Sequence, residues 1–495
     1  MPRTFLFPRP RPRGLLGRRL EMDEQLVLAS GVLGGLLVLW VAPGIPFKLL
    51  GFVATAGVCG WATLAPWQNR TFLKWFEIRR AHRRLLRDGQ LLYQSIAPKV
   101  GRRGDGTPER VAPPPGIPDV EWISARTAYG DLAILLQTDE AMFTAAIEVE
   151  GQKNFGGLDA EDKEALVGAW EFLLKSTADS GGRVRRLQWV SRVVPTDPNA
   201  HARDAEARRD ATAPQWLHDS YDQLLRTVAI SAEDRRLLIV VGIPYDTELV
   251  AEARRYRTLH EGFGIVLGKE LEEFIRRLGL AQLRWVRNLD EPALASWLHH
   301  SYDPSHWIND TRGMDRASAW PAEVDARDPA VMLSRSWEGA EPWHSVTAWW
   351  KQLPVLPVGV NFLAPLLLYV QDIIFTVAVT MDLVTSDEAL REAMADVTNE
   401  IGQADNRAGK VNDPREAKDR RTATATMHDI ANGAAGIRLA GWVTVTAPTA
   451  ERLRQHRDLL RAQATRANLS LEWCDHEHFR AHANTLPLAG GLLKG

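Results

Sequence analysis

The residues best suited to chemistry gather near the C-terminus. Thiol, carboxylate and imidazole groups occur there within nine residues: Cys474, Asp475, His476, Glu477, His478 and His482. His478 and His482 are four residues apart, so a helix would place both imidazoles on one face, as a zinc site requires. The sequence His-Glu-His, however, lacks the two-residue gap of the helical zinc-protease motif. We therefore predict no metal ion and no cofactor. Any metal site would take its ligands from Cys474, His478 and His482.

Two other segments match catalytic motifs only in part. A phosphate-binding loop needs glycine, four residues, then Gly-Lys-Ser/Thr. Before Gly268-Lys269, Phe263 stands at the first glycine position, and Glu270 stands where the hydroxyl is needed. Ser180 lies in an Asp-Ser-Gly-Gly sequence like the nucleophile loop of trypsin-like proteases, but no histidine and acid can be assigned to it. We predict that the chain is not an enzyme.

A basic stretch over residues 68–97 is predicted to form a helix. Aromatic residues such as Phe72 and Trp75 interleave there with five arginines: Arg79, Arg80, Arg83, Arg84 and Arg87. Such a surface can contact anionic lipid headgroups, or it can grip the backbone and bases of a nucleic acid. We favour the lipid contact and keep direct DNA binding as the alternative.

The basic stretch belongs to a strong charge asymmetry in a chain of 495 residues with a net charge of −2. Residues 1–110 contain 18 Lys and Arg against 7 Asp and Glu, whereas the remainder contains 42 against 55. The 45% hydrophobic and 25% charged composition excludes a fully disordered chain, a collagen-like fibre and a transporter with many spans. With only two cysteines, the chain has neither a disulfide framework nor a four-cysteine zinc module.

Two uncharged segments near the N-terminus are long enough to cross a bilayer. Residues 25–42 provide 18 such residues and residues 49–67 provide 19. As helices they would be about 27–29 Å long, close to the thickness of the hydrocarbon core. We therefore predict a two-helix transmembrane hairpin over residues 25–67. Six glycines suit close packing of its helices: Gly31, Gly34, Gly35, Gly51, Gly57 and Gly60.

The flanks of the hairpin predict its orientation. Residues 1–24 contain six arginines, residues 68–97 contain six arginines and one lysine, and between the spans only Lys48 is charged. Basic residues remain on the cytoplasmic side of a membrane. We therefore expect a two-span protein of the cell membrane with both termini in the cytoplasm.

The remaining chain is predicted to be a tethered cytoplasmic body. Residues 98–119 are rich in proline and glycine and indicate an extended linker. Between residues 120 and 488, strand-like and helical segments alternate, which indicates an α/β (α+β) body. We expect two ferredoxin-like lobes, at about 120–245 and 330–488, with helical insertions, and a tail at 489–495. Glu148 and Glu150 share one face of a predicted strand, which we interpret as a solvated edge.

One further segment is long enough to span a membrane. Residues 352–371 are uncharged over 20 positions, but they contain Pro354, Pro357 and Pro365. Prolines remove backbone donors and kink a helix, which is unfavourable in lipid. We interpret this segment as core strand and loop, while a third span stays open.

The order of these parts resembles a known family. The matching residues are the hairpin end Ile147–Gly151, the strand at 376–384, the strand Trp442–Val445, and the closing segment from Phe479 to Leu488 with its Leu-Pro-Leu. This body is similar to the N-terminal, non-motor half of type IV secretion ATPases. The first 70 or so residues resemble the small two-span PrgI-like membrane subunit of Gram-positive conjugation systems.

The layout is similar to motor-less membrane proteins of actinobacterial conjugation or type IV secretion-like systems. That resemblance implies a structural subunit that anchors or docks a separate ATPase, and with it a coupling protein, at the membrane. Since the chain has no phosphate-binding loop, ATP hydrolysis is not carried over. Two alternatives remain: a membrane-associated DNA-handling protein, and a membrane-tethered metal-dependent hydrolase.

Overall fold

The computed structural model describes two compact units. One consists chiefly of Leu6–Leu91, and the other, called the body, of Leu92–Leu390 and Asp429–Gly495. The described residues are 22–41, 44–64, 66–67, 70–96, 111–151, 157–179, 181–195, 209, 212–229, 233–337, 339–354, 356–391, 393–394 and 436–491. Most of the predicted N-terminal segment 1–24 and residues 98–110 of the predicted linker lie outside these ranges.

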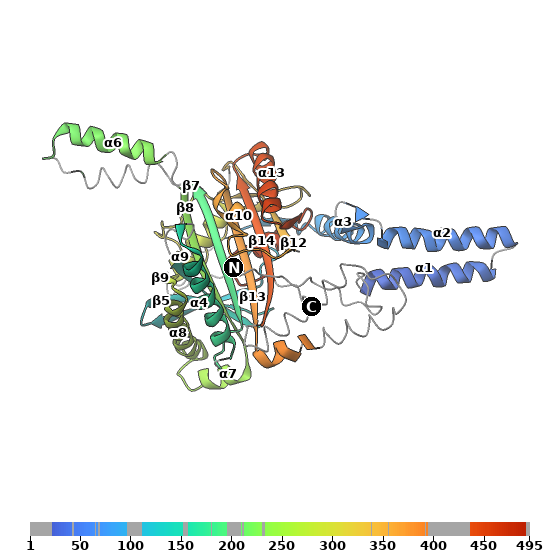
Figure 1. Cartoon of the computed structure of the whole chain (residues 1–495), viewed down its shortest axis with the longest axis horizontal. Coiled ribbons are helices and arrows are strands. Elements are labelled where there is room, and N and C mark those ends of the chain that lie inside the picture. The colour runs from blue at the N-terminus through green and yellow to red at the C-terminus, as the bar shows by residue number, and fades with distance from the viewer. Residues whose placement is uncertain are drawn as a thin grey trace. The chain divides into compact units, whose positions relative to one another are not determined.

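Two apolar helices, α1 (Met22–Val41) and α2 (Ile45–Leu64), lie side by side in the N-terminal unit (Figure 1). Their packing uses some of the predicted glycines. A Cβ at Gly35 would lie 2.8 Å from Phe52 Cδ2, and a Cβ at Gly31 would clash with Cys59. Gly57 and Gly60, in contrast, have no neighbour within 4 Å among the described residues, so their predicted role in close packing is wrong for this pair.

Only α2 is long and apolar enough to cross a membrane among the described helices. The candidate span is Ile45–Thr63, 19 residues, of which only Thr63 at its end is buried within the protein. The apolar part of α1, Leu26–Val41, is shorter. The predicted second span at 49–67 is also shifted, because α2 ends at Leu64 and Pro66–Trp67 forms a short strand, β1.

β1 pairs with β2 (Arg70–Thr71), which leads directly into the basic helix α3 (Phe72–Arg87). The rings of Trp61 on α2 and Phe72 on α3 are in contact, with centroids 5.0 Å apart. The predicted juxtamembrane helix is therefore present, although it ends ten residues earlier than residue 97.

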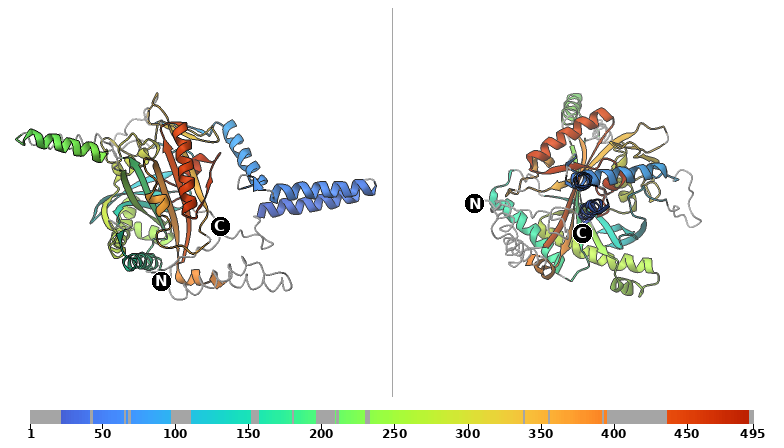
Figure 2. Two further views of the ribbon diagram at one scale, coloured as in Figure 1. Left: turned by 45° about the horizontal axis from the view of Figure 1, so that its top comes forward. Right: turned by 90° about the vertical axis from the view of Figure 1, so that its right-hand side faces the viewer.

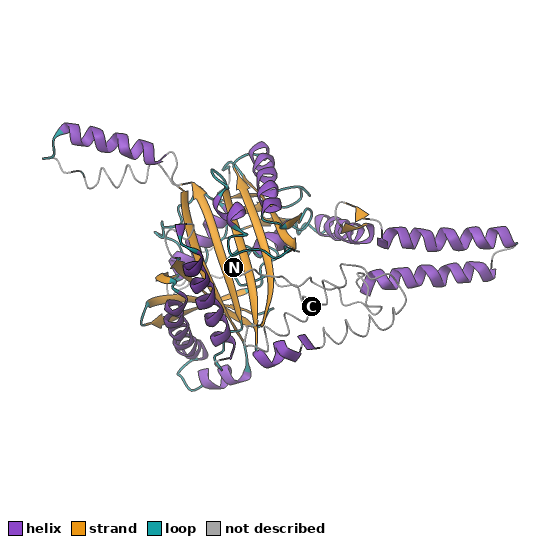
Figure 3. Ribbon diagram, viewed as in Figure 1, coloured by secondary structure: helices purple, strands orange, loops and turns teal. Residues whose placement is uncertain are grey.

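A single antiparallel sheet of 13 strands organises the body (Figure 3). Its order is β3-β10-β11-β12-β14-β13-β7-β8-β6-β5-β4, with β15 paired to β12 and β9 paired to β6. The first strands are β3 (Leu92–Gln94), β4 (Val120–Thr127), β5 (Gly130–Gln137), β6 (Met142–Glu150), β7 (Arg186–Pro195), β8 (Glu233–Pro244) and β9 (Arg284–Asn288). The others are β10 (Glu323–Asp325), β11 (Met332–Arg335), β12 (Trp343–Gln352), β13 (Ile374–Val384), β14 (Gly436–Ala447) and β15 (Ser470–Trp473).

The predicted mixed α/β class of the body is confirmed. Strands from both predicted lobes join one sheet, because β7 pairs with β13 from Arg186↔Asp382 to Val193↔Phe375. The helices of the body are α4 (Ala160–Asp179), α6 (Gln215–Ala229), α7 (Thr247–Ala253), α8 (Leu259–Leu278), the 3₁₀ turn η3 (Gly279–Ala281), α9 (Glu291–Tyr302), α10 (Ala364–Leu368), α13 (Ala450–Arg466) and α14 (His478–Ala483). Figure 2 shows two further views of this arrangement.

The two faces of the central strands differ in chemistry. On one face, alternate residues such as Leu187, Phe375 and Val443 are fully buried and apolar. Leu453 and Leu460 of α13 share a core cluster with Phe375 and Val443, which therefore lies under that helix, whereas Leu187 belongs to a second core cluster. The other face, called here the polar face, carries Arg186, Gln188, Arg192, Thr376, Thr380 and Thr444. Because strand side chains alternate between faces, this division follows directly from the sequence of β7, β13 and β14.

Three predicted segments differ in the structure. Residues 111–119 belong to the body rather than to a free tether, since Val111 and Ile117 are buried. Residues 489–491 of the predicted tail are bound to the polar face. The described part of residues 352–371 comprises Gln352 at the end of β12, loops and the short helix α10, with Leu366 and Val370 fully buried.

Candidate functional site

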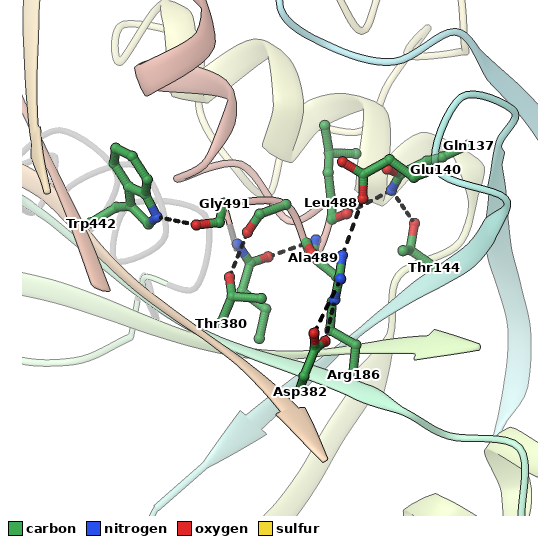
Figure 4. A network of polar contacts seen from close by, with 12 residues as sticks. Gln137, Glu140, Thr144, Arg186, Thr380, Asp382, Trp442, Leu488, Ala489 and Gly491 are labelled. Atoms are coloured by element: carbon green, nitrogen blue, oxygen red, sulfur yellow. Dashed lines mark hydrogen bonds and ion pairs between the residues drawn. The ribbon is translucent and has the colours of Figure 1, made fainter. Parts of the chain in front are cut away.

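The C-terminal segment lies on the polar face and is held by side chains from four strands (Figure 4). Four consecutive carbonyls each accept one hydrogen bond. The donors are Gln137 Nε2 to Leu488 O (2.6 Å), Arg186 Nη1 to Ala489 O (3.2 Å), Thr380 Oγ1 to Gly490 O (2.6 Å) and Trp442 Nε1 to Gly491 O (3.0 Å). We call this arrangement the C-terminal clamp. These four carbonyls pair with no strand. The clamp gives each of them a hydrogen-bond donor, which a buried backbone carbonyl requires.

Arg186 is the charged centre of the clamp. Its Nε donates to Asp382 Oδ1 (2.7 Å) and its Nη1 to Glu140 Oε2 (3.1 Å). Asp382 lies directly opposite Arg186 in the β7–β13 pairing, so the sheet register itself places this ion pair. Two carboxylates therefore fix the guanidinium while it also binds the Ala489 carbonyl.

The end of the clamp needs a glycine. Gly491 has φ +96, a left-handed conformation that L side chains rarely adopt. A Cβ at this position would also lie 2.5 Å from Trp442 Nε1, the atom that donates to the Gly491 carbonyl. Glycine thus permits both the backbone turn and the close approach of the indole.

A second polar group, the arginine–histidine cluster, comprises Arg192, His300, Tyr302 and His482. None of the four is more than 2% exposed. Arg192 Nη1 donates to Thr376 Oγ1 (2.7 Å), and Nη2 donates to the backbone carbonyl of His300 (3.0 Å). His300 lies in the last turn of α9, where helix carbonyls carry partial negative charge.

The start and register of α9 follow from local sequence. Asp290 caps the helix by accepting a hydrogen bond from the Ala293 backbone N–H (3.0 Å), and a proline occupies the first turn. The opposite end then presents His300 and Tyr302 to the interior. The Tyr302 ring contacts the His482 ring of α14 with centroids 4.6 Å apart.

Burial governs protonation in the arginine–histidine cluster. It lowers the pKa of Arg192 to about 9, so the guanidinium remains charged at neutral pH. Burial, together with the nearby charge of Arg192, lowers the pKa of His482 to about 3 and that of His300 well below its usual value. Both imidazoles are therefore neutral at neutral pH.

The predicted metal ligands are brought onto one side of the body but are engaged differently. His478 Nε2 donates to the Pro329 carbonyl (2.9 Å), and burial lowers the pKa of His478. Cys474 is buried, with Sγ 3.8 Å from the Glu472 carbonyl. Throughout the described ranges, no three His, Cys, Asp or Glu side chains are grouped so that they could hold a metal ion.

The predicted basic residues of α3 face outward. Arg79, Arg80, Arg83, Arg84 and Arg87 are all exposed. The Arg79 guanidinium also lies 5.4 Å from the centre of the buried Trp75 ring, a cation–π contact. These arginines are thus available to an anionic surface.

The interpretation of Glu148 as a solvated residue is wrong. Its side chain is 4% exposed and accepts from Arg236 Nη1 (2.8 Å) and Arg287 Nε (2.5 Å). Pairing of β6 with both β8 and β9 brings these two arginines to one carboxylate. The local sequence pattern does not predict which distant strands pair, so it could not show that Glu148 would be buried.

Sequence analysis also missed Arg186, Gln188 and Arg192. A signal was present, because Arg186-Leu187-Gln188-Trp189 alternates polar and apolar residues and Arg192 lies an even number of positions further along the strand, which predicts a polar face. Gln188 completes the C-terminal clamp. It accepts from the Ala489 backbone N–H (3.0 Å) and donates to the Asn484 carbonyl (3.1 Å).

No protein-family model matches the chain, and no curated protein is similar to it at a significant level. The function must therefore be argued from the residues themselves. On the polar face, the described side chains bind the backbone of the C-terminal segment. They also enclose the buried guanidinium of Arg192.

Proposed function

We propose that the protein is a structural membrane subunit of a conjugative or type IV secretion-like apparatus. In this role α1 and α2 form a membrane hairpin, and the body lies on the cytoplasmic side, where it docks a separate ATPase. The observation that carries the proposal is the apolar helix α2, whose span has no buried residue before Thr63, followed closely by the exposed arginines of α3.

The face of α3 supports a position at the membrane surface. Phe72, Phe76, Arg80, Arg83 and Arg87 are spaced by four, four, three and four residues, which places them along one side of the helix. All five are exposed. The aromatic residues lie at the end of α3 nearest α2, so they can enter the interface while the arginines reach lipid phosphates, each worth about 1 kcal/mol.

The anchor is tested by deleting residues 1–67. We expect the full chain to sediment with membranes and to need detergent for extraction, whereas the shortened chain should be soluble. A matched control lacks only residues 1–21 and should remain in the membrane. Tight membrane association of the chain without residues 1–67 would contradict the anchor.

The orientation is tested with an impermeant maleimide. Glu248→Cys places a thiol at an exposed position of α7 in the body. We expect labelling in lysed cells and none in intact cells. The unsubstituted protein controls for Cys59 and Cys474. Labelling of Glu248→Cys in intact cells would place the body outside and overturn the proposal.

The partner is tested by affinity purification of the detergent-solubilised full chain with mass spectrometry. The resemblance of the Leu-Pro-Leu segment to the end of the non-motor half of type IV secretion ATPases supports a motor ATPase as the docked partner. We expect such an ATPase, accompanied by a coupling protein. Repeated recovery of membrane lipid and no ATPase would contradict the docking role.

The exposed arginines of α3 also favour a second candidate, a DNA-handling protein. Phosphate contacts release counterions, so DNA affinity would fall steeply with salt. Arg80→Ser, Arg83→Ser and Arg87→Ser together should then abolish DNA binding. An equal number of exposed arginines on α13, replaced as Arg454→Ser, Arg461→Ser and Arg466→Ser, is the control. If the α3 variant loses only its binding to anionic vesicles, the lipid role is supported instead.

A further inference from the structure

Arg192 carries a positive charge that no described carboxylate balances. Its guanidinium is 1% exposed, and its partners are a threonine hydroxyl and the His300 carbonyl. An isolated buried charge is strongly unfavourable unless it is paired. The C-terminal end of α9 offsets part of it, since a helix end carries about half an elementary charge.

The arginine–histidine cluster also contains unused donors. Arg192 Nε has no hydrogen-bond partner, and neither ring nitrogen of His482 has one. A neutral imidazole carries one N–H, so His482 supplies one free donor. His300 differs, because its Nδ1 lies 2.5 Å from the His306 carbonyl and must donate to it, which leaves Nε2 as an acceptor.

We propose that the arginine–histidine cluster binds one small monovalent anion of the halide class, chloride in the cell, between Arg192 Nε–H and the N–H of His482. The anion completes the charge balance that the end of α9 begins. It also links β7 of the sheet to α14, the short helix that precedes the C-terminal clamp.

The chemistry of the cluster selects this ligand over others. A single enclosed positive charge matches a monovalent anion and repels a metal cation. A polyanion such as phosphate would bring excess negative charge and need more donors than two. A water molecule could accept the same hydrogen bonds but would leave the charge of Arg192 unbalanced.

The test measures thermal unfolding of the full-length protein in detergent. Chloride replaces gluconate stepwise at constant ionic strength. A ligand that binds only the folded state raises stability with its concentration. We expect the midpoint temperature to rise with the logarithm of the chloride concentration, by about 2 °C when chloride exceeds its dissociation constant tenfold. Bromide should act similarly, and crystals grown in bromide should show anomalous density beside Arg192.

Variants distinguish this site from halide binding elsewhere. Arg192→Met should unfold at the same temperature in chloride and gluconate. Arg236→Met is the matched control, since it removes a half-buried arginine that carboxylates already balance, and it should keep the chloride dependence. If Arg192→Met does not fold, His482→Phe replaces it, because the ring contact with Tyr302 is kept while the donor is lost. Equal midpoints for the unsubstituted protein in both salts, or a chloride dependence that survives in Arg192→Met or His482→Phe, would overturn the proposal.

Discussion

Arg192 and Arg236 face each other across β7 and β8 but have opposite surroundings. They are directly paired in the strand register and so emerge on the same face of the sheet. Arg236 Nη1 donates to Glu148 (2.8 Å) and Nε to Asp234 (3.0 Å). Arg192 turns instead toward Thr376 and the end of α9.

The difference teaches that residue type and sheet position do not decide how a buried charge is tolerated. Two like charges placed directly opposite repel each other, and the two guanidinium groups diverge to different partners. Around Arg236 the charges balance, because Arg236 and Arg287 are matched by Glu148 and Asp234. Around Arg192, a helix end and neutral imidazoles take the place of carboxylates.

Removing the carboxylate shared by Arg236 and Arg287 should have the largest effect. Glu148→Gln keeps the shape but leaves both guanidinium groups without their common partner. Breaking a buried pair costs about 3–5 kcal/mol. Denaturant unfolding of the full chain in detergent should show this loss. If the free energy of unfolding falls by less than about 1 kcal/mol, the ion pairs of Glu148 contribute no more to stability than Arg192 does.

Acidification should lower the stability of the folded protein mainly through the histidines near Arg192. The folded pKa of His482 is lowered to about 3, below an unfolded value of about 6.5. The unfolded chain therefore binds the proton first as pH falls, and stability decreases below about pH 6.5. At pH 5 the loss from His482 is about 2 kcal/mol, and His300 acts in the same direction.

His482→Phe should flatten this pH dependence, because it removes the imidazole whose pKa burial lowers. Unfolding midpoints of this variant and of the unsubstituted protein, measured between pH 7.5 and 5, would check it. A pH profile that His482→Phe does not alter would show that other groups govern acid sensitivity.

Replacing the two arginines separately should sharpen the comparison further. In gluconate, Arg192→Met loses two hydrogen bonds but also removes an unmatched buried charge, so we expect a loss of only about 1 kcal/mol. Arg236→Met leaves Glu148 and Asp234 short of a partner and should cost about 3 kcal/mol. Equal losses would mean that the carboxylates do not distinguish the two sites.

The smallest effect should come from a pair outside this region. Arg126 and Asp131 form an ion pair 3.1 Å apart with side chains that are 87% and 61% exposed. Surface pairs of this kind contribute little because water screens them. Asp131→Asn should therefore leave the unfolding midpoint unchanged, which sets the baseline for the four substitutions at Glu148, His482, Arg192 and Arg236.

Sequence patterns predicted the strands and helices better than their partners. The strands expected at 376–384 and Trp442–Val445 lie within β13 and β14. The pairing of Arg186 with Asp382, however, joins residues nearly 200 positions apart, and local periodicity carries no information on such a distance. The sequence also could not show that residues 489–491, predicted as part of a tail, would occupy the polar face.

The predicted chemistry near the C-terminus shows the same limit. His478 and His482 do share α14, as their spacing indicated. Their surroundings come from Pro329, Tyr302 and Arg192, which are distant in sequence. The type of a residue could therefore be read locally, but its burial and its neighbours could not.

The C-terminal clamp has a consequence for how the body is made. Gln137 of β5 and Trp442 of β14 both hold residues 488–491, so a strand synthesised early waits for a segment that follows about 350 positions later. Until that segment has been synthesised and has left the ribosome, the polar face stays uncovered. The body should therefore complete its folding late, which makes the partly synthesised polypeptide a natural client of chaperones.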